Sequence, residues 1–219
     1  WDGFNAFLYW PLGQTDAVKV ANPTEREGYV STSNFRARLQ KAMTTPDRPE
    51  GPPYFKVEGL SAYPSDPPLL LLGIRARGPH WKSASKVIEI VSFPCAMEEG
   101  ECIVSPDSRI WLQSGPVGVP EEVGVSGLEY DPYWKRLYVL LSFEEPGGRS
   151  GGYLGILPEG ATSLTLVRNG RGTAYRFRRK PEGVAVLDRD RILIVYDEDR
   201  TESDERRKNE AIFSIFRWE

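Results

Sequence analysis

The 219-residue sequence has no long apolar run, almost no net charge, and very little cysteine or histidine. Its apolar runs are only a few residues long, whereas a membrane-spanning helix needs about 20, so we expect no membrane span. A formal net charge of −3 argues against a nucleic-acid-binding protein, because such proteins normally carry a basic surplus. Two cysteines and one histidine are too few for a structural zinc site, so none is expected.

The two cysteines, Cys95 and Cys102, lie seven residues apart on either side of a polar loop that contains Gly100. The preceding residues, 86–93, alternate as a strand does, with Glu89 opposed to its apolar neighbours. A hairpin here would bring the two thiols together, so we predict a Cys95–Cys102 disulfide. Two reduced, unrelated thiols are the alternative. Because disulfides persist in oxidising compartments, the predicted pair implies a periplasmic or extracellular protein.

What the sequence does contain is a repeated pair of apolar segments, most clearly in KPEGVAVLDRDRILIVYDEDR at residues 180–200. A Glu-Gly pair starts a short apolar run, a polar turn follows at residues 188–191, and a second apolar run ends at Tyr196. Two β-rich runs joined by a tight turn that contains Asp predict a β-hairpin.

The same order recurs twice earlier in the chain, in residues 56–73 and 126–144. The glycines at corresponding positions, Gly59, Gly127 and Gly183, are 68 and 56 residues apart. A hairpin unit repeated at about this length is typical of a β-propeller blade, and abundant glycine and proline suit a turn-rich chain. We therefore predict a single all-β, propeller-like domain over residues 1–219, built from repeated four-stranded blades. At roughly 50 residues a unit the chain holds roughly four or five blades, which makes a small ring or part of a larger one.

The segments KVEGLSAYP…LLLLGIRARGP and KPEGVAVL…ILIVYDED give the chain a resemblance to known propellers. It is similar to bacterial proteins of unknown function related to the esterase-like phytase domain. More distantly, it resembles calcium-dependent lactonase and phosphotriesterase propellers. The close match covers a small part of the chain, and a loose match covers most of it. The resemblance implies a propeller in which a Glu near the start of a blade binds a metal ion.

Glu58 and Glu182 precede two of the repeated glycines and are candidate metal ligands. The innermost strand of each propeller blade lines a central channel, so both carboxylates would point toward one axis from different blades. They would repel each other there unless a cation or an Arg or Lys partner lay between them, and Ca²⁺ prefers such oxygen ligands. Asn34 and Glu27, in a less regular Glu-Gly segment, would add oxygen ligands. The alternative is that each Glu binds backbone N–H groups or pairs with a nearby arginine or with Lys180.

Arg75 and Arg77 lie at the end of the first repeated hairpin, where its second strand is followed by a loop. They are candidate ligand-binding residues. Two guanidinium groups can hold a phosphate or carboxylate group by paired hydrogen bonds. The alternative is that they pair with Glu58 or with the acidic cluster at Asp197.

Residues for nucleophilic or acid–base chemistry have little support in the sequence. His80, the one histidine, lies in a predicted loop without an identifiable carboxylate partner. Ser150 belongs to a Gly-x-Ser-x-Gly sequence, but a Pro-Gly turn precedes it and a predicted strand follows it. A nucleophile elbow needs a strand before the serine and a helix after it.

These observations favour a non-catalytic, extracytoplasmic binding propeller. Such a protein would take a small anionic ligand or a protein partner through its central channel or its rim. The alternative function is a calcium-dependent hydrolase of phosphoesters or lactones at a site in the central channel. That alternative depends mainly on the resemblance, and propellers serve both kinds of function.

Overall fold

The computed structural model describes residues 6–26, 28–197 and 211–218. Within these ranges the regular structure is almost all β-strand, which confirms the all-β prediction. The exceptions are helix α1 (Phe35–Ala42) and a short 3-10 turn at Trp81–Ser83. This part of the chain contains no helix with the length and apolar character needed to cross a membrane.

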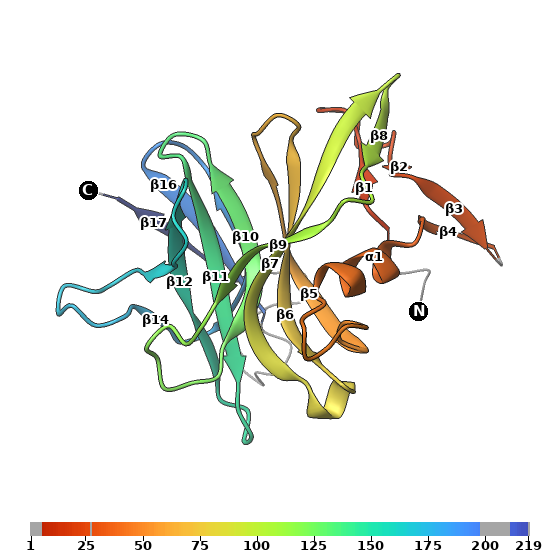
Figure 1. Ribbon diagram of the computed structural model, residues 1–219. Coiled ribbons are helices and arrows are strands. Elements are labelled where there is room, and N and C mark those ends of the chain that lie inside the picture. Colours follow the sequence, from red (N-terminus) through yellow and green to blue (C-terminus); the bar gives the residue numbers. More distant parts are fainter. Residues whose placement is uncertain (1–5, 27, 198–210, 219) are drawn as a thin grey trace.

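Most strands belong to three antiparallel sheets that follow one another along the chain (Figure 1). The first sheet contains, in spatial order, β5 (Tyr54–Tyr63), β6 (Leu69–Gly78), β7 (Ser85–Glu98) and β9 (Arg109–Ser114), and β8 (Glu101–Val104) pairs with the far end of β7. The second contains β10 (Gly124–Asp131), β11 (Arg136–Glu144), β12 (Ser150–Pro158), and the short β13 (Thr165–Leu166) and β14 (Arg176–Phe177), which both pair with β12. The third contains β15 (Lys180–Val186), β16 (Arg191–Asp197) and β17 (Phe213–Arg217). The first two strands of each sheet form one of the three predicted hairpins, which are thereby confirmed.

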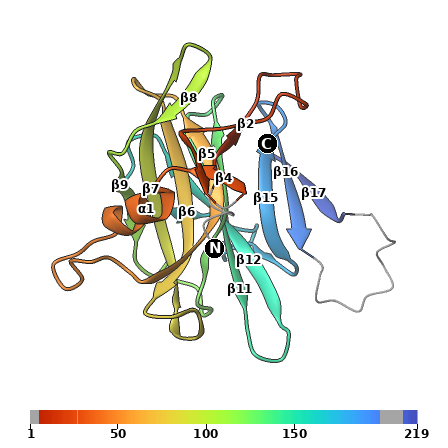
Figure 2. The ribbon, with the colours of Figure 1, turned by 90° about the vertical axis from the view of Figure 1, so that its right-hand side faces the viewer.

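The sheets are stacked face to face, and β11 shows how the sequence produces this arrangement. Successive side chains of a strand point to opposite faces of its sheet. One set of β11 side chains packs against the first sheet, and consists of Leu137, Val139, Leu141 and Phe143. The alternate residues, Tyr138 and Leu140, pack against the third sheet. The second sheet is therefore buried on both faces, with the first and third sheets on either side of it (Figure 2).

The N-terminal segment covers the outer face of the first sheet. Besides α1 it contains two small ribbons, β1 (Leu8–Tyr9) with β2 (Lys19–Val20), and β3 (Pro23–Arg26) with β4 (Tyr29–Thr32). Leu39 of α1 and Met43 directly after it are fully buried, in one apolar cluster with Ile74 and Phe93 of the first sheet. The first sheet is thus covered on one face by this segment and on the other by the second sheet.

The first strand of each sheet contains a β-bulge at the residue before the repeated glycine. The unpaired residues are Glu58 in β5, Ser126 in β10 and Glu182 in β15. A bulge changes the direction of one side chain and increases the local twist. The following glycine allows close packing between sheets, because a Cβ atom on Gly59 would lie only 2.7 Å from Cγ of Leu128. The repeated pattern therefore marks the places where neighbouring sheets touch.

The predicted disulfide is not formed, and both cysteines are free thiols. Cys95 and Cys102 lie on the β7–β8 hairpin as expected, but Cys95 is opposite Val104 and Cys102 is opposite Met97. The two thiols are therefore diagonal neighbours. Residues in this relation are typically about 7–8 Å apart, whereas the Cα atoms of a disulfide lie about 4.4–6.8 Å apart. Burial raises the pKa of both thiols, which keeps them protonated at neutral pH. The periplasmic or extracellular location depended on this disulfide and stays a prediction.

The thiol state can be tested by alkylation under non-reducing conditions. We expect the denatured protein to take up two iodoacetamide groups without prior reduction, because no S–S bond protects the sulfur atoms. Alkylation of the folded protein should be slow, since raised pKa values leave little thiolate. Mass spectrometry measures both results. A denatured protein that stays unmodified, with a mass two hydrogens below that of the reduced chain, would show that the disulfide is present.

Candidate functional site

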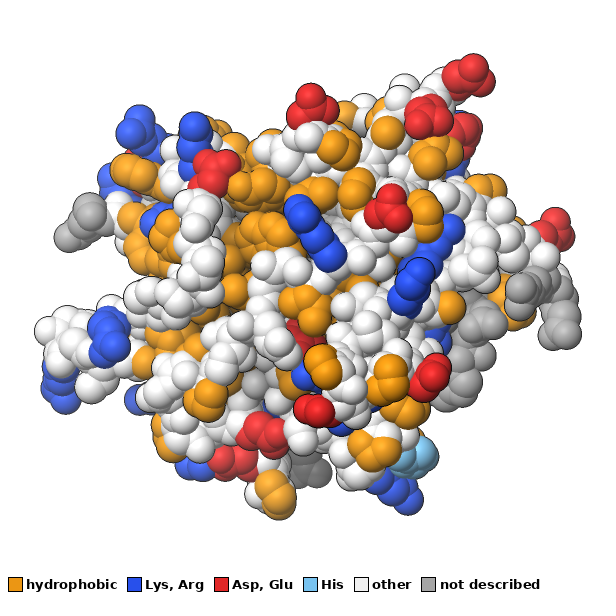
Figure 3. Space-filling view, viewed as in Figure 1, with side chains coloured by type: hydrophobic (Ala, Val, Ile, Leu, Met, Phe, Trp, Pro, Cys, Tyr) orange, Lys and Arg blue, Asp and Glu red, His pale blue; other side chains and the backbone are white. Residues whose placement is uncertain are grey.

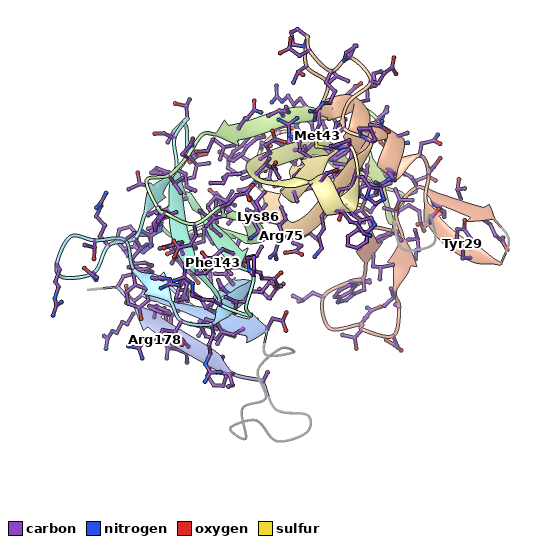
Figure 4. The ribbon with its side chains drawn as sticks, turned by 90° about the horizontal axis from the view of Figure 1, so that it is seen from below. Tyr29, Met43, Arg75, Lys86, Phe143 and Arg178 are labelled. Carbon is purple, nitrogen blue, oxygen red and sulfur yellow. The ribbon has the colours of Figure 1, made fainter. Side chains whose placement is uncertain are left out.

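Arg75, on β6, is a buried arginine whose side chain is only 4% exposed. Both predicted carboxylates contact its guanidinium group. Glu58 forms a close ion pair with Nη1, and Oε1 of Glu182 lies 3.7 Å from the same nitrogen. Oε1 of Glu144, on β11, lies 3.7 Å from the other terminal nitrogen, Nη2. One guanidinium group, in the interior of the molecule (Figure 4), therefore gathers carboxylates from all three sheets.

Lys180, the first residue of β15, is a second buried cation at the same place. Its Nζ lies 2.9 Å from Oε1 of Glu144, 2.6 Å from Oε1 of Glu182 and 3.3 Å from Oδ2 of Asp197. Burial lowers the pKa of Lys180, but hydrogen bonds to Glu182 and Glu144 outweigh this effect, and the pKa is raised. We call this group the central ion cluster, and it consists of Arg75, Lys180, Glu58, Glu144, Glu182 and Asp197.

In the central ion cluster the carboxylates pair with an arginine and a lysine, which is the alternative to calcium that the sequence left open. The two repeat carboxylates do lie close together, and the cations near them are Arg75 and Lys180. Among the described residues, no group of three His, Cys, Asp or Glu side chains is arranged to hold a metal ion. Binding of Ca²⁺ by Glu58 and Glu182 would therefore require both carboxylates to exchange their present ion pairs.

The other predicted metal ligands lie elsewhere or are not described. Asn34 is on the N-terminal segment, directly before α1, where its φ of 53° places it in the left-handed region. This segment covers the outer face of the first sheet, and the central ion cluster lies where the three sheets meet. Glu27 lies outside the described residues.

Arg77 does not join Arg75, although both belong to β6. Its Nη2 lies 2.7 Å from Oε1 of Glu89, a carboxylate on β7 that also accepts a hydrogen bond of 2.6 Å from Nε2 of Gln113. The two predicted ligand-binding arginines therefore bind different carboxylate groups of the protein. Glu89 and Gln113 had no signal in the sequence except that Glu89 interrupts an apolar strand.

Of the two residues considered for catalysis, His80 has a structural role and Ser150 lacks the surroundings of a nucleophile. Nδ1 of His80 accepts a hydrogen bond of 3.3 Å from the backbone N–H of Lys82, so the imidazole caps the short 3-10 turn. Ser150 begins β12, and no helix follows it, so it lacks the geometry of a nucleophile elbow.

Ser126 is a buried residue that the sequence did not single out. It occupies the bulge of the second sheet, at the position that Glu58 and Glu182 occupy in the other two. Its hydroxyl group donates a hydrogen bond of 2.7 Å to the carbonyl oxygen of Pro181, which connects the second sheet to the third. Aligning the three repeated glycines would have identified this position, with Ser-Gly in place of Glu-Gly.

The third sheet has a second, apolar feature on the face that points away from the second sheet. Alternation along its strands places five apolar side chains there, and these are Ala185, Leu193, Val195, Phe213 and Ile215. Leu187, directly after β15, is a sixth apolar residue and is also exposed. None of them belongs to the apolar clusters formed by the described residues. Phe213 is 58% exposed and Ile215 is 52% exposed. We call these six residues the outer face of the third sheet. Figure 3 shows the opposite side of the molecule, where hydrophobic side chains gather over the second sheet, and the third sheet lies behind it in this view.

No protein-family model, curated protein or solved structure matches this chain. Its function therefore has to be argued from its own residues.

Replacing Arg75 with methionine should destabilise the protein strongly. The variant leaves carboxylates from three sheets beside an uncharged side chain, and breaking a buried ion pair in this way costs about 3–5 kcal/mol. Urea unfolding followed by circular dichroism measures the change. Arg191→Met is the matched control, because Arg191 pairs with Asp188 on the exposed hairpin turn. A loss as small as that of the control would contradict the central role of Arg75.

Calcium should leave the stability of the metal-stripped protein unchanged. We expect no shift in melting temperature at about 1 mM Ca²⁺, a concentration at which extracellular calcium modules bind the ion. The reason is that Arg75 and Lys180 already neutralise the carboxylates of the cluster. A clear stabilisation that Glu58→Gln and Glu182→Gln abolish would instead favour the calcium site.

Proposed function

We propose that this chain is a non-catalytic binding module of propeller-type blades, which associates through the outer face of its third sheet. The packing of the sheets supports the blade interpretation. Each sheet is an antiparallel meander, and the first strand of the second sheet, β10, contacts both β5 and β15. In a propeller the first strands of successive blades lie side by side in this way around the central axis.

The observation that carries the proposal is the uneven covering of the sheets. The first sheet is covered by the N-terminal segment and the second sheet, and the second sheet is covered by its two neighbours. The outer face of the third sheet is exposed and largely apolar among the described residues, with Leu187, Phe213 and Ile215 each 45% exposed or more and with Arg191 and Arg217 at one end. Contiguous apolar patches on a protein surface usually mark interaction sites.

The occupant that fits this face best is the same face of a second copy. Small residues, Gly183 and Ala185, lie on β15, and large ones, Phe213 and Ile215, lie on β17. A two-fold axis parallel to the strands would place β17 of one copy over β15 of the other. Large side chains would then meet small ones, as self-complementary dimer interfaces require. Stacked sheets pack about 10 Å apart by interdigitating side chains of this kind.

The carboxylates support binding over hydrolysis. A calcium-dependent hydrolase would need Glu58 and Glu182 as metal ligands, and both are held in ion pairs with Arg75 and Lys180. The extracytoplasmic location stays a prediction from the sequence, and the two free thiols give it no support.

The dimer is tested by replacing Phe213 and Ile215 together with glutamate. Light scattering coupled to size exclusion should show that the parent protein dimerises with rising concentration and that the double variant stays monomeric, because buried unpaired carboxylates oppose association. Both side chains are largely exposed, so circular dichroism should show a folded variant.

The matched control is the double variant Leu60→Glu and Met97→Glu, which adds the same charge at two exposed apolar positions on the first sheet. This control should dimerise as the parent does. A parent protein that is monomeric up to its solubility limit, or a dimer that survives both glutamates at the outer face, would overturn the proposal.

A further inference from the structure

A pocket of about 280 Å³ lies beside the central ion cluster, since Lys86 in its lining donates a hydrogen bond to the backbone of Glu144. Its walls come from β6, β7 and β9 and from the loop that leads from β9 to β10. Apolar side chains of the loop, Val117, Val119 and Val123, form one part of the lining. The polar part of the lining includes Arg77, Lys86, Glu89 and Gln113.

Glu89 is the unusual residue of this pocket, because it is a carboxylate only 1% exposed. Its Oε1 atom is satisfied by Arg77 and Gln113, at 2.7 Å and 2.6 Å. Its Oε2 atom is buried and has no hydrogen-bond partner among the described residues. A buried carboxylate oxygen without a donor is costly, so a ligand that brings a donor to this atom would gain a favourable contact.

The other carboxylates of the pocket are already engaged. Glu121 accepts a hydrogen bond of 2.6 Å from the hydroxyl group of Tyr153, and Glu122 accepts one of 2.9 Å from the backbone N–H of Lys86. Oε2 of Glu89 is therefore the buried carboxylate oxygen of this lining that lacks a hydrogen-bond partner among the described residues.

Lys86 gives the same pocket a positive group. Its Nζ donates one hydrogen bond of 3.2 Å to the carbonyl oxygen of Glu144, and an ammonium group has three N–H donors. Burial and the nearby charge of Arg75 lower the pKa of Lys86. Figure 4 shows the two side chains beside each other in the interior. An anionic group next to Lys86 would offset this unfavourable environment.

We propose that this pocket binds a small zwitterion of the amino-acid type. The ammonium group of the ligand donates to Oε2 of Glu89, its carboxylate accepts from Lys86, and a short apolar side chain packs against Val117 and Val119. A ligand with only an ammonium group would contact Glu89 but not Lys86, and a ligand with only a carboxylate would contact Lys86 but not Glu89. The volume is just below that of pockets for drug-sized ligands, which begin at about 300 Å³, and so suits a smaller molecule. The site is separate from the outer face of the third sheet, so either proposal can fail without the other.

Three probes that share an isobutyl unit test the proposal on the unmodified protein. L-Valine carries both charges, isobutylamine carries only the ammonium group, and isovalerate carries only the carboxylate. Calorimetric titration should show valine binding at least roughly tenfold more tightly than either half, since it adds a charge-assisted hydrogen bond. Absence of valine binding, or equal binding of a single-charge probe, would overturn the proposal.

Two variants then assign the contacts. Glu89→Gln should weaken valine and isobutylamine at least roughly tenfold and leave isovalerate unchanged, whereas Lys86→Met should weaken valine and isovalerate and leave isobutylamine unchanged. The matched controls are Glu98→Gln, at the exposed end of the same strand, and Lys82→Met, on the exposed 3-10 turn. Neither control should alter binding of any probe. If both variants weakened the binding of all three probes alike, the effect would be structural and would count against the assigned contacts.

Discussion

The buried guanidinium group of Arg75 is the contact that fixes how the three sheets sit against one another. Apolar faces drive the stacking, but a shift of two residues along a strand keeps the same apolar face buried, so burial alone does not select one register. The guanidinium group selects it, because Glu58, Glu144 and Glu182 come from three different sheets and all lie near it. The bulges are part of the same constraint, since a bulge is what turns the side chains of Glu58 and Glu182 out of the regular alternation of their strands.

The central ion cluster is connected to the pocket at Glu89 through Lys86. This residue lines the pocket, and its Nζ donates a hydrogen bond to the backbone carbonyl of Glu144 in the cluster. The positive charge of Arg75 disfavours the charged form of Lys86, so an anion in the pocket and the carboxylates of the cluster act on Lys86 in the same direction. A cluster that holds the sheets together thereby helps to make a neighbouring cavity receptive to a negative group. One set of buried charges would then serve both the stability of the fold and the proposed recognition of an anionic group.

The hairpins could be predicted from the sequence because each one is local. A Glu-Gly or Ser-Gly start, two apolar runs and a polar turn determine a hairpin within about 20 residues, and tertiary packing does not change that result. The convergence of Glu58 and Glu182 could also be inferred, because equivalent positions of a repeat occupy equivalent places. Their partner could not be selected, because calcium and Arg75 meet the same electrostatic need.

The burial of Glu89 could not be predicted from the sequence either. Alternation in β7 indicated an exposed acidic side, but β7 contributes to apolar clusters on both faces of its sheet, so no position on it is reliably solvent-facing. The disulfide depended on a register difference of two residues, which spacing in the sequence does not reveal.

The two ends of the row of sheets differ, and this difference determines what kind of assembly is possible. At one end α1 and the adjoining residues cover the first sheet, while at the other end the outer face of the third sheet is exposed. If both ends were open, the third sheet of one copy could stack on the first sheet of the next, and such a head-to-tail contact would repeat into a ring or a filament. Helix α1 occupies that position, so the outer face of one copy has no matching sheet at the opposite end of another. The face that remains available to it is its own counterpart. Pairing of that kind buries the outer face of both copies. Because the N-terminal segment covers the first sheet, the assembly should stop at a dimer and not extend into a filament.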